Sequence, residues 1–510
     1  MKAFLMYKDQ DFDLQRELPS NEKALTQDLE LNTLFNAMAL GDKFLFEVSK
    51  KAILCSLNND INTILYRQNI LKDCLRNSSI IKDIYDTAVK SIESEKKIYF
   101  GFFREYPDAI LSRSIEVLQM FVSMLKKLKD IADEYADKFE SEGFAAFFVM
   151  LKKELSDEYF ASIQNHLREL GFRKGVLISA ELGKGNKGSN YILRKTLDKK
   201  QNWMKRIFNK KPPVYTFYIS DRDESGAKAL SELKDRGINL VANALAQSTD
   251  HILSFFNMLR TELAFYIGCL NLHEQLAQKG GPMSFPQPVA SSERRLSFKG
   301  LYDVCLTLSL EQRIVGNDLN ADNKDLAIIT GANQGGKTVF LRGIGLSQLM
   351  MQCGMFVTAE SFCSNICDGL FTHYKREEDI TMKSGKLDEE LARMSDIVDN
   401  IKTNSMVLLN ESFAATNERE GSEIARQIIC ALLEKRIKVV FVTHLYEFAH
   451  SFNDKKTESA IFLRAERKPD GRRTFKIIEG EPLETSYGED LYNSIFETNK
   501  VHYCLQFLPL

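Results

Sequence analysis

The sequence lacks the features that mark secreted, membrane-spanning or strongly charged proteins. No apolar run approaches the roughly 20 residues that a membrane helix needs. The start, MKAFLMYKDQDFDLQ, is too short in its apolar part, and too acidic after it, for a signal peptide. The 510 residues include 68 Lys and Arg against 70 Asp and Glu, a net charge of −2. We therefore expect no membrane partner, and any basic surface must be local.

The nine cysteines do not form a metal or redox motif. Cys363 and Cys367 are separated by three residues rather than two, and no pair of His residues accompanies them. This usage is typical of reduced thiols in the interior of a cytosolic protein. We expect a cytoplasmic location.

The first 300 residues are predicted to be mostly helical, in a chain long enough for roughly two to four domains. Between Ala109 and Phe139 there is neither Gly nor Pro. Pro107 before this stretch and Gly143 after it are typical start and stop signals. Apolar residues recur at spacings of three and four, as on one buried helix face, at Val117, Leu118, Phe121, Leu125, Leu128 and Ile131.

A second long helix is predicted from Ile238 to Gln278, interrupted only by Gly268. Two helices of this length, far apart in the sequence, are expected to pair as an antiparallel stalk. The alternative is that both belong to an ordinary helical bundle.

Three short segments between these helices are predicted to be strands. They are rich in β-branched and aromatic residues, with Gly, Asn and Pro between them. They are GVLISAEL (175–182), NYILRK (190–195) and VYTFYIS (214–220). We expect a small β-containing insertion between two helical arms.

After Pro286 and Pro288 the sequence alternates between predicted strands and predicted helices. The strands are DLAIIT (325–330), SMVLLN (405–410) and KVVFVTH (438–444), and the helices are KTVFLRGIGLSQLMMQC (337–353) and EREGSEIARQIICALLEKR (418–436). This alternation predicts a mostly parallel sheet with both faces covered. The predicted fold class is therefore multidomain, with a helical part, a small β insertion and a C-terminal α/β domain.

The stretch GANQGGKT (331–338) matches the phosphate-loop pattern G-x-x-x-x-G-K-[ST] without a mismatch. Its glycines let successive backbone N–H groups point at phosphate oxygens, and the helix that follows presents its N-terminus to the same anion. Lys337 would reach the β- and γ-phosphates, and the Thr338 hydroxyl would ligate Mg²⁺. The cofactors implied are ATP and Mg²⁺. The predicted nucleotide-binding residues are Gly331, Ala332, Asn333, Gln334, Gly335, Gly336, Lys337, Thr338 and Val339.

A phosphate-loop ATPase also needs an acidic group at the end of a neighbouring strand, and here Asn410 and Glu411 stand at that point. An Asp is usual where Asn410 stands. Asn keeps a carbonyl acceptor but loses the charge, so we expect Thr338 and Asn410 to hold Mg²⁺ weakly. Glu411 would polarise the attacking water. The alternative role for Glu411 is to cap a helix with its carboxylate.

Further segments of the chain share one resemblance. They are IVGNDL (314–319), CGMFVTAESF (353–362), MVLLNESFAATNEREG (406–421), VTHLYEF (442–448) and TSYGEDL (485–491). With the phosphate loop, they resemble the ATPase domain of MutS proteins, the DNA mismatch-recognition ATPases. Upstream, YRQNILKDCL (66–75) and TELAFYIGCLNLHEQL (261–276) resemble the helical core and lever region of that family.

The resemblance implies an ABC-like ATPase that dimerises head to tail, with each nucleotide completed by a signature segment of the opposite subunit. SGKLDEELARM (384–394) is the best match to that signature, so Ser384 and Gly385 would face the partner's γ-phosphate. In ABC-type ATPases a His after a strand contacts the γ-phosphate, which is the role implied for His444. The alternative is a purely structural His at a strand end. With Lys337 and Glu411, His444 completes the predicted catalytic set. Lever helices would carry the ATP state to a clamp that encloses DNA.

Some positions depart from the family pattern. Leu387 and Asp388 follow Lys386 where the family has Ser-Thr, and Ile314 stands in the place of an aromatic that stacks on adenine. The helical core begins so early that we expect a short form, without the N-terminal mismatch-recognition and connector domains. The predicted domains are a helical core with a first lever arm (1–139), a clamp-like insertion (140–220), a second lever arm (221–290) and the ATPase domain (291–510).

The stretch from Arg194 to Lys211 is locally basic, with eight Lys or Arg and one Asp. It includes Trp203, the only Trp of the chain, and Phe208. Cations beside planar rings suit a phosphate backbone with occasional base stacking. The alternative is a solvated loop without a ligand. The predicted contacts, to backbone rather than to base edges, are Lys199, Lys200, Trp203, Lys205, Arg206, Lys210 and Lys211.

Together these features predict an ATP-hydrolysing, DNA-binding homodimer of the MutS type. One alternative is a protein that acts on RNA or the ribosome with the same type of ATPase domain. Another is a switch that binds nucleotide with negligible turnover, because Asn410 lacks the usual charge.

Overall fold

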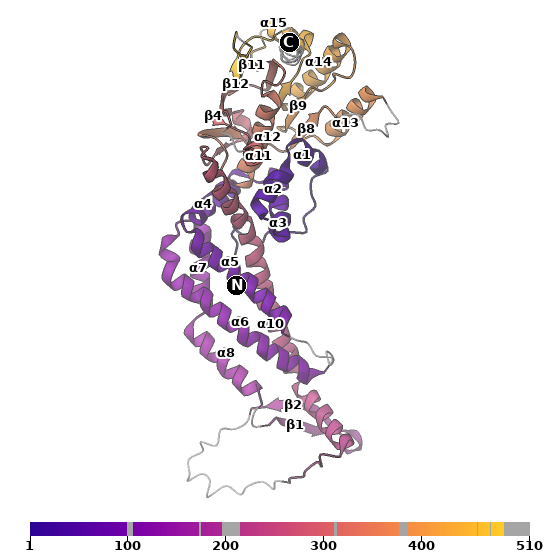
Figure 1. Cartoon of the computed structure of the whole chain (residues 1–510). Helices are drawn as coiled ribbons and strands as arrows, with labels where there is room; N and C mark the ends of the chain where they lie inside the picture. Colours follow the sequence, from indigo (N-terminus) through magenta and orange to yellow (C-terminus); the bar gives the residue numbers. More distant parts are fainter. Residues whose placement is uncertain are drawn as a thin grey trace, which may run out of the picture. The chain divides into compact units, whose positions relative to one another are not determined.

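The computed structural model consists of two compact units (Figure 1). The first unit comprises Met1–Ala3, Lys82–Phe139 and Ala145–Arg260, and the second comprises Phe4–Ile81, Glu140–Phe144 and Thr261–Leu510. The residues that the structure describes are 1–98, 106–172, 175–195, 215–310, 314–376, 385–455, 457–469 and 471–483. The multidomain α/β fold expected from the sequence is confirmed, whereas the four predicted domain boundaries stay a prediction.

Long helices dominate the first unit. α6 (Pro107–Tyr135) corresponds to the helix predicted from Ala109, and it is followed by a short 3₁₀ turn, η2 (Ala136–Lys138), and by α8 (Asp157–Leu170). Three helices have residues in both units, namely α5 (Ser78–Lys97), α7 (Glu142–Glu154) and α10 (Glu224–Lys279). None of the helices in the described ranges is long and apolar enough to span a membrane.

α10 begins at Glu224 rather than at the predicted Ile238, and Gly268 does not interrupt it. The Asp223 carboxylate caps its first turn by accepting the N–H of Gly226 at 2.9 Å. A Cβ at Gly268 would lie 3.0 Å from the Ser49 hydroxyl oxygen. This glycine therefore allows close helix packing and does not end the helix.

Within the first unit, α6 packs against the first part of α10. The contacts, in chain order along α6, are Asp108 with Lys234, Leu111 with Ile238 and Phe121 with Phe256. Since the numbers rise together, the two helices run in the same direction. The antiparallel pairing predicted for them is therefore wrong. The prediction placed only a β-containing insertion between them, whereas two further helices, α7 and α8, also lie there in the chain.

That β hairpin consists of β1 (Leu177–Leu182) and β2 (Gly188–Arg194), which pair antiparallel around a short turn, η3 (Lys184–Asn186). Two of the three predicted strands are thus present. The third is wrong, because residues 215–220 are irregular and Val214 lies outside the described ranges.

The second unit begins with an irregular segment that is held by two buried side chains of α10. The Glu262 carboxylate is fully buried and accepts the N–H groups of Leu5, at 2.5 Å, and Phe12, at 3.2 Å. The Tyr266 hydroxyl donates to the Leu5 carbonyl oxygen at 2.5 Å. Burial raises the pKa of Glu262 to about 7, against the lowering effect of these N–H donors.

The remaining helices of the second unit surround two sheets. They are α1 (Glu22–Asp28), α2 (Leu31–Ala39), α3 (Lys43–Leu54), η1 (Ser56–Asn58), α4 (Ile61–Arg76), η4 (Ser291–Glu293), α11 (Val304–Ser309), α12 (Lys337–Cys353), α13 (Lys386–Asn400), α14 (Glu418–Glu434) and α15 (Tyr446–Asp454). α12 spans the residues predicted from the sequence.

The larger sheet has six strands in the order β12-β11-β6-β10-β9-β8. They are β6 (Leu326–Gly331), β8 (Leu370–Tyr374), β9 (Met406–Asn410), β10 (Lys438–Val442), β11 (Ala460–Arg467) and β12 (Arg473–Glu479). Neighbouring strands are parallel throughout, except for β12, which pairs antiparallel with β11. The carboxyl ends of β6, β9 and β10 therefore meet at one edge of the sheet.

Helices cover both faces of this sheet. On one face, the apolar side chains of α13, α14 and α15 form a continuous cluster with alternate residues of the central strands, among them Val407 and Phe441. On the other face, Gly345 of α12 approaches Leu408 so closely that a Cβ would come within 2.6 Å of its Cδ1 atom. Burial on both faces explains why the central strands are almost entirely apolar.

The smaller sheet has four strands in the order β3-β7-β4-β5. They are β3 (Gln287–Val289), β4 (Leu296–Leu301), β5 (Asn317–Asn320) and β7 (Ser361–Asn365). The sequence did not predict this sheet, whose strands are short and pair with segments distant in the chain.

Candidate functional site

The phosphate loop connects the end of β6 to the start of α12, as its sequence predicts. Gly331 and Gly336 have φ values of +100° and +89°, which residues with a Cβ rarely adopt. At Gly335, a Cβ would lie 2.6 Å from the Cβ of Ala465 and 2.8 Å from the carbonyl oxygen of Ala332. No side chain caps the N-terminus of α12. Its first N–H groups thus remain available for an anion.

Lys337 lies at the centre of this loop. Its side chain is buried, and its ammonium group donates to the carbonyl oxygens of Gly331, at 2.8 Å, and Ala332, at 3.0 Å. Burial lowers the pKa of Lys337 to about 8, an effect that Glu411 opposes and Arg473 reinforces. Gly331 and Ala332 therefore support Lys337 instead of lining the cavity, whereas Asn333 to Val339 line it.

Thr338 and Asn410 come together at the sheet edge. The Thr338 hydroxyl donates to Asn410 Oδ1 at 3.2 Å. Within the described ranges there is no group of three or more His, Cys, Asp or Glu side chains that could hold a metal. Two neutral oxygens side by side fit an Mg²⁺ ion that is held mainly by nucleotide phosphates and water, because Mg²⁺ prefers oxygen ligands and keeps several waters.

Glu411 and His444 form a second pair at the same edge. His444 Nε2 lies 3.1 Å from Glu411 Oε1, and each side chain is 32% exposed. The hydrogen bond from His444 lowers the pKa of Glu411, so its carboxylate is charged at neutral pH. The Glu411 N–H donates to the Val442 carbonyl oxygen at 2.8 Å, which ties the end of β9 to β10. Glu411 has a φ of +52°, an uncommon backbone conformation that often marks functional sites.

A cavity of about 470 Å³ adjoins the loop. Sequence reasoning identified its phosphate end, together with Glu411 and Ile314, but missed the residues that line the rest. They are Leu306, Leu310, Val315, Asn317 and Phe475. These residues are mostly apolar, as expected of the wall around a planar base.

Phe475, on β12, is the one aromatic ring among these lining residues. Its side chain is 50% exposed, and its carbonyl oxygen accepts from Asn317 Nδ2 at 3.3 Å. Asn317 Oδ1 in turn accepts the N–H of Ile477 at 2.7 Å. Asn317 therefore fixes β12 beside the loop. No motif surrounds Phe475 in the sequence, so only the pairing of β12 with β11 brings it to the cavity.

The proposed signature segment is described only in part. Gly385 precedes α13, and a Cβ placed on it would have no neighbour within 4 Å among the described residues. Ser384 lies outside the described residues, as do all seven predicted nucleic-acid contacts between Lys199 and Lys211 and the motif at 485–491. Their roles stay predictions.

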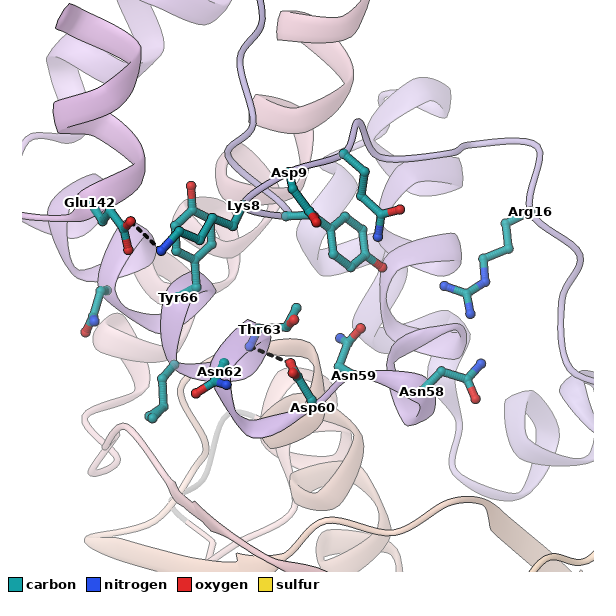
Figure 2. A pocket seen from close by; sticks show the side chains of 14 residues that line it. Lys8, Asp9, Arg16, Asn58, Asn59, Asp60, Asn62, Thr63, Tyr66 and Glu142 are labelled. Atoms are coloured by element: carbon teal, nitrogen blue, oxygen red, sulfur yellow. Dashed lines mark hydrogen bonds and ion pairs between the residues drawn. The ribbon is translucent and has the colours of Figure 1, made fainter.

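A larger cavity, of about 1120 Å³, lies elsewhere in the second unit and is shown in Figure 2. Two pairs of its lining residues interact with each other. Lys8 forms an ion pair with Glu142 at 2.6 Å, and the Asp60 carboxylate caps α4 by accepting the Thr63 N–H at 2.8 Å. Its mixed charge does not favour one class of ligand, and none of the predicted nucleotide, metal or nucleic-acid contacts lines it.

Comparison with known proteins assigns the two parts of the chain to one family. Residues 59–279 match the MutS2 N-terminal domain, and residues 327–501 match MutS domain V. The second match contains the phosphate loop, both residue pairs and α13. The chain belongs to the MutS family.

Several curated relatives align over long stretches. The DNA mismatch repair protein MutS of Clostridium novyi is 24% identical over 92% of this chain and 49% of its own length. That of Syntrophomonas wolfei is 26% identical over 67% of this chain and 43% of its own length. MutS protein homolog 4 of Mus musculus is 25% identical over 54% of this chain and 29% of its own length. The chain thus spans less than half the length of these MutS relatives.

Proposed function

We propose that this MutS-family chain is an ATP-dependent DNA-binding protein that binds and hydrolyses ATP in the cavity beside the phosphate loop. The observation that carries the proposal is the convergence of three groups at one sheet edge. They are the Lys337 ammonium, the Thr338–Asn410 oxygen pair at 3.2 Å and the Glu411–His444 pair at 3.1 Å. These are the cation, metal and water-orienting groups that phosphoryl transfer requires.

Each residue has a separate task in hydrolysis. Lys337 exchanges its two carbonyl partners for the β- and γ-phosphate oxygens, which are stronger acceptors because they are charged. Glu411 orients the attacking water and accepts its proton, and His444 both keeps Glu411 ionised and contacts the γ-phosphate. Thr338 and Asn410 would hold Mg²⁺, which would supply positive charge beside the phosphates. The rest of the catalytic effect is positioning.

The adenine base is proposed to lie against the apolar wall of the cavity. Ile314 cannot supply an aromatic face, but Phe475 offers a half-exposed ring on the same cavity. Stacking on Phe475 and contact with Leu310 and Val315 would hold the base with little selectivity for adenine over other bases.

The proposed assembly is a head-to-tail homodimer in which α13 of one subunit completes the site of the other. The described residues leave space around Gly385, which supports this, because a phosphate group of a partner's nucleotide could approach the N-terminus of α13 there. α10 contributes residues to both units, so it offers a continuous helix for transmitting the nucleotide state to a DNA-binding clamp.

A second candidate is a nucleotide-binding switch with negligible turnover. The observation that favours it is the neutral Asn410 beside Thr338, in the position where a carboxylate would strengthen the metal site. ATP would then bind and close the dimer without being hydrolysed quickly.

Phosphate release with Mg²⁺ distinguishes the two candidates. For an ATPase, Glu411→Gln is expected to reduce kcat by about 100-fold or more, because a positioned general base contributes 10²–10⁴-fold. Binding of ATP to the variant should be unchanged, since the carboxamide keeps the shape of the side chain. Equally low rates in wild type and Glu411→Gln would instead support the switch.

A further inference from the structure

His373, on β8, makes three polar contacts in a fully buried position. Its Nδ1 atom lies 2.7 Å from Ser412 Oγ, and its Nε2 atom lies 3.0 Å from the carbonyl oxygen of Glu390. Ser412 Oγ is also 2.7 Å from the carbonyl oxygen of His373 itself. The imidazole ring stacks on Phe413, with centroids 5.5 Å apart and planes at 19°.

The available protons do not satisfy all of these contacts at once. The Glu390 carbonyl oxygen only accepts, so Nε2 must carry a proton. Burial, assisted by Arg393, lowers the pKa of His373 to about 4, so the ring is neutral and Nδ1 is an acceptor. The single hydroxyl proton of Ser412 then has two acceptors, Nδ1 and the His373 carbonyl oxygen. The network therefore has two alternative arrangements with similar contacts.

The two ends of this hydrogen-bond network lie in elements with different proposed functions. Ser412 directly follows Glu411, the proposed water-orienting carboxylate, in a turn where Glu411 and Phe413 both have positive φ values, +52° and +63°. Glu390 belongs to α13, the helix whose N-terminus carries Gly385. Arg393 of α13 also donates to the Tyr374 carbonyl oxygen, next to His373, at 3.0 Å. α13 is thus attached to β8 beside the Glu411 turn.

The same junction contains a buried carboxyl group that is poorly satisfied. Glu390 is 2% exposed, and neither of its side-chain oxygens has a well-formed hydrogen bond within the described residues. Burial raises the pKa of Glu390, and the backbone N–H of Phe413 opposes this only in part. A buried polar group without a full partner is destabilising, so a small shift of α13 that pairs it would be favourable.

We infer that His373 is a positioning residue that couples the two nucleotide sites of a dimer, by linking the turn of Glu411 to the helix that faces the partner's nucleotide. This inference rests on the proposed function. A partner's γ-phosphate that draws α13 toward it moves the Glu390 carbonyl oxygen, the imidazole and Ser412, and so changes the orientation of Glu411. The coupling is reciprocal, so the Glu411 turn also affects the partner's nucleotide.

Two substitutions each remove one contact of the imidazole ring, either that with Glu390 or that with Ser412. His373→Asn keeps a polar group near the position of Nδ1, and so retains the contact with Ser412 while losing that with Glu390. His373→Gln places its carboxamide nearer the position of Nε2 and does the reverse. Met394→Leu, a volume-conserving change at another buried position of α13, is the matched control.

The experiment compares dimers with one and with two working sites. Differently tagged copies, one carrying Lys337→Ala, are purified as mixed dimers, and phosphate release per intact site is measured. In the wild-type and Met394→Leu backgrounds, emptying one site is expected to change the rate at the other by about 5-fold or more, as is typical of allosteric coupling. In both His373 backgrounds the change is expected to fall below about 2-fold.

A purely structural role for His373 gives a different result. It would lower the melting temperature and the absolute rates but leave the dependence on the partner site intact. Undiminished dependence in either His373 variant, or no dependence in wild type, overturns the inference. If ATP does not bind in calorimetry, or if no dimer forms in sedimentation, the proposed function fails with it. If the dimer hydrolyses ATP and its two sites stay coupled in both His373 variants, the proposed function stands and only the inference about His373 is wrong.

Discussion

Asn410 is the residue at which the site departs most from a standard phosphate-loop ATPase. Its carboxamide oxygen is 3.2 Å from the Thr338 hydroxyl and so occupies the place of a metal ligand without its charge. Asn410→Asp is expected to lower the half-saturating Mg²⁺ concentration about 10-fold, equivalent to about 1.4 kcal/mol, and to raise turnover. Phosphate release titrated with Mg²⁺ measures both effects.

Asn400→Asp adds the same charge at an exposed position of α13 and serves as the control for that substitution. Its Mg²⁺ dependence should match that of wild type. If Asn410→Asp changes neither the Mg²⁺ requirement nor the rate, Asn410 does not hold the metal.

At the residue scale, the sequence predicted the polar groups of the site better than its apolar wall. Lys337, Thr338, Asn410, Glu411 and His444 each lie in a short local pattern, a loop or a strand end, and parallel pairing brings those ends together. Phe475 is 64 residues beyond Glu411 and reaches the cavity only because β12 folds back on β11. Such a contact has no local signature.

At the scale of secondary-structure elements, Glu262 fixes the N-terminal segment to α10. Burial raises the pKa of this carboxyl from 4.5 to about 7 in the folded protein. Between these two values the folded state binds more protons than the unfolded state, so stability is lost as the pH rises. The free energy of unfolding is expected to fall by about 3 kcal/mol across this window because of Glu262.

Urea unfolding at pH 5 and pH 8 tests this effect as a difference between variants. Glu262→Gln cannot ionise, so the difference in its free energy of unfolding between the two pH values should be about 3 kcal/mol smaller than in wild type. Glu274→Gln, at an exposed position of the same helix, should behave as wild type. An equal pH dependence in wild type and Glu262→Gln would contradict the account of this carboxyl.

Long and strongly patterned elements were the easiest to predict. α12 matches its predicted residues because a phosphate loop precedes it and Gly354, with a φ of +83°, ends it. The small sheet was missed because its strands are short and their partners distant. The strand predicted at 214–220 was wrong because β propensity reflects packing on neighbours. Tyr215, Phe217 and Tyr218 are more than 80% exposed, so the described residues do not bury them.

At the scale of the whole molecule, the proposal links ATP binding in the second unit to nucleic-acid binding by the basic stretch between Lys199 and Lys211. Each phosphate contact contributes a slope of about −0.9 to the dependence of log affinity on log salt. Changing Lys199, Lys200, Lys205, Arg206, Lys210 and Lys211 together to Ser is therefore expected to flatten the slope for duplex DNA by up to about 5. Fluorescence anisotropy at several salt concentrations measures the slope.

A control variant carries Ser at the exposed Lys23, Lys402 and Lys468 of the second unit, and its slope should equal that of wild type. A structured RNA of equal charge, run in parallel, tests the RNA-directed alternative. Tighter binding to the RNA would favour that alternative, and an unchanged slope in the Ser variant would remove the basic stretch from the nucleic-acid site.

The most direct test of the central claim is a calorimetric titration of ATP with Mg²⁺ into wild type, Lys337→Ala and the exposed-site control Lys402→Ala, combined with sedimentation. We expect saturable heat and a shift toward dimers for wild type and Lys402→Ala. For Lys337→Ala we expect at least about 100-fold weaker binding, close to 2.7 kcal/mol, with the fold retained. No heat and no change in sedimentation for wild type, or equally tight binding by Lys337→Ala, would contradict it.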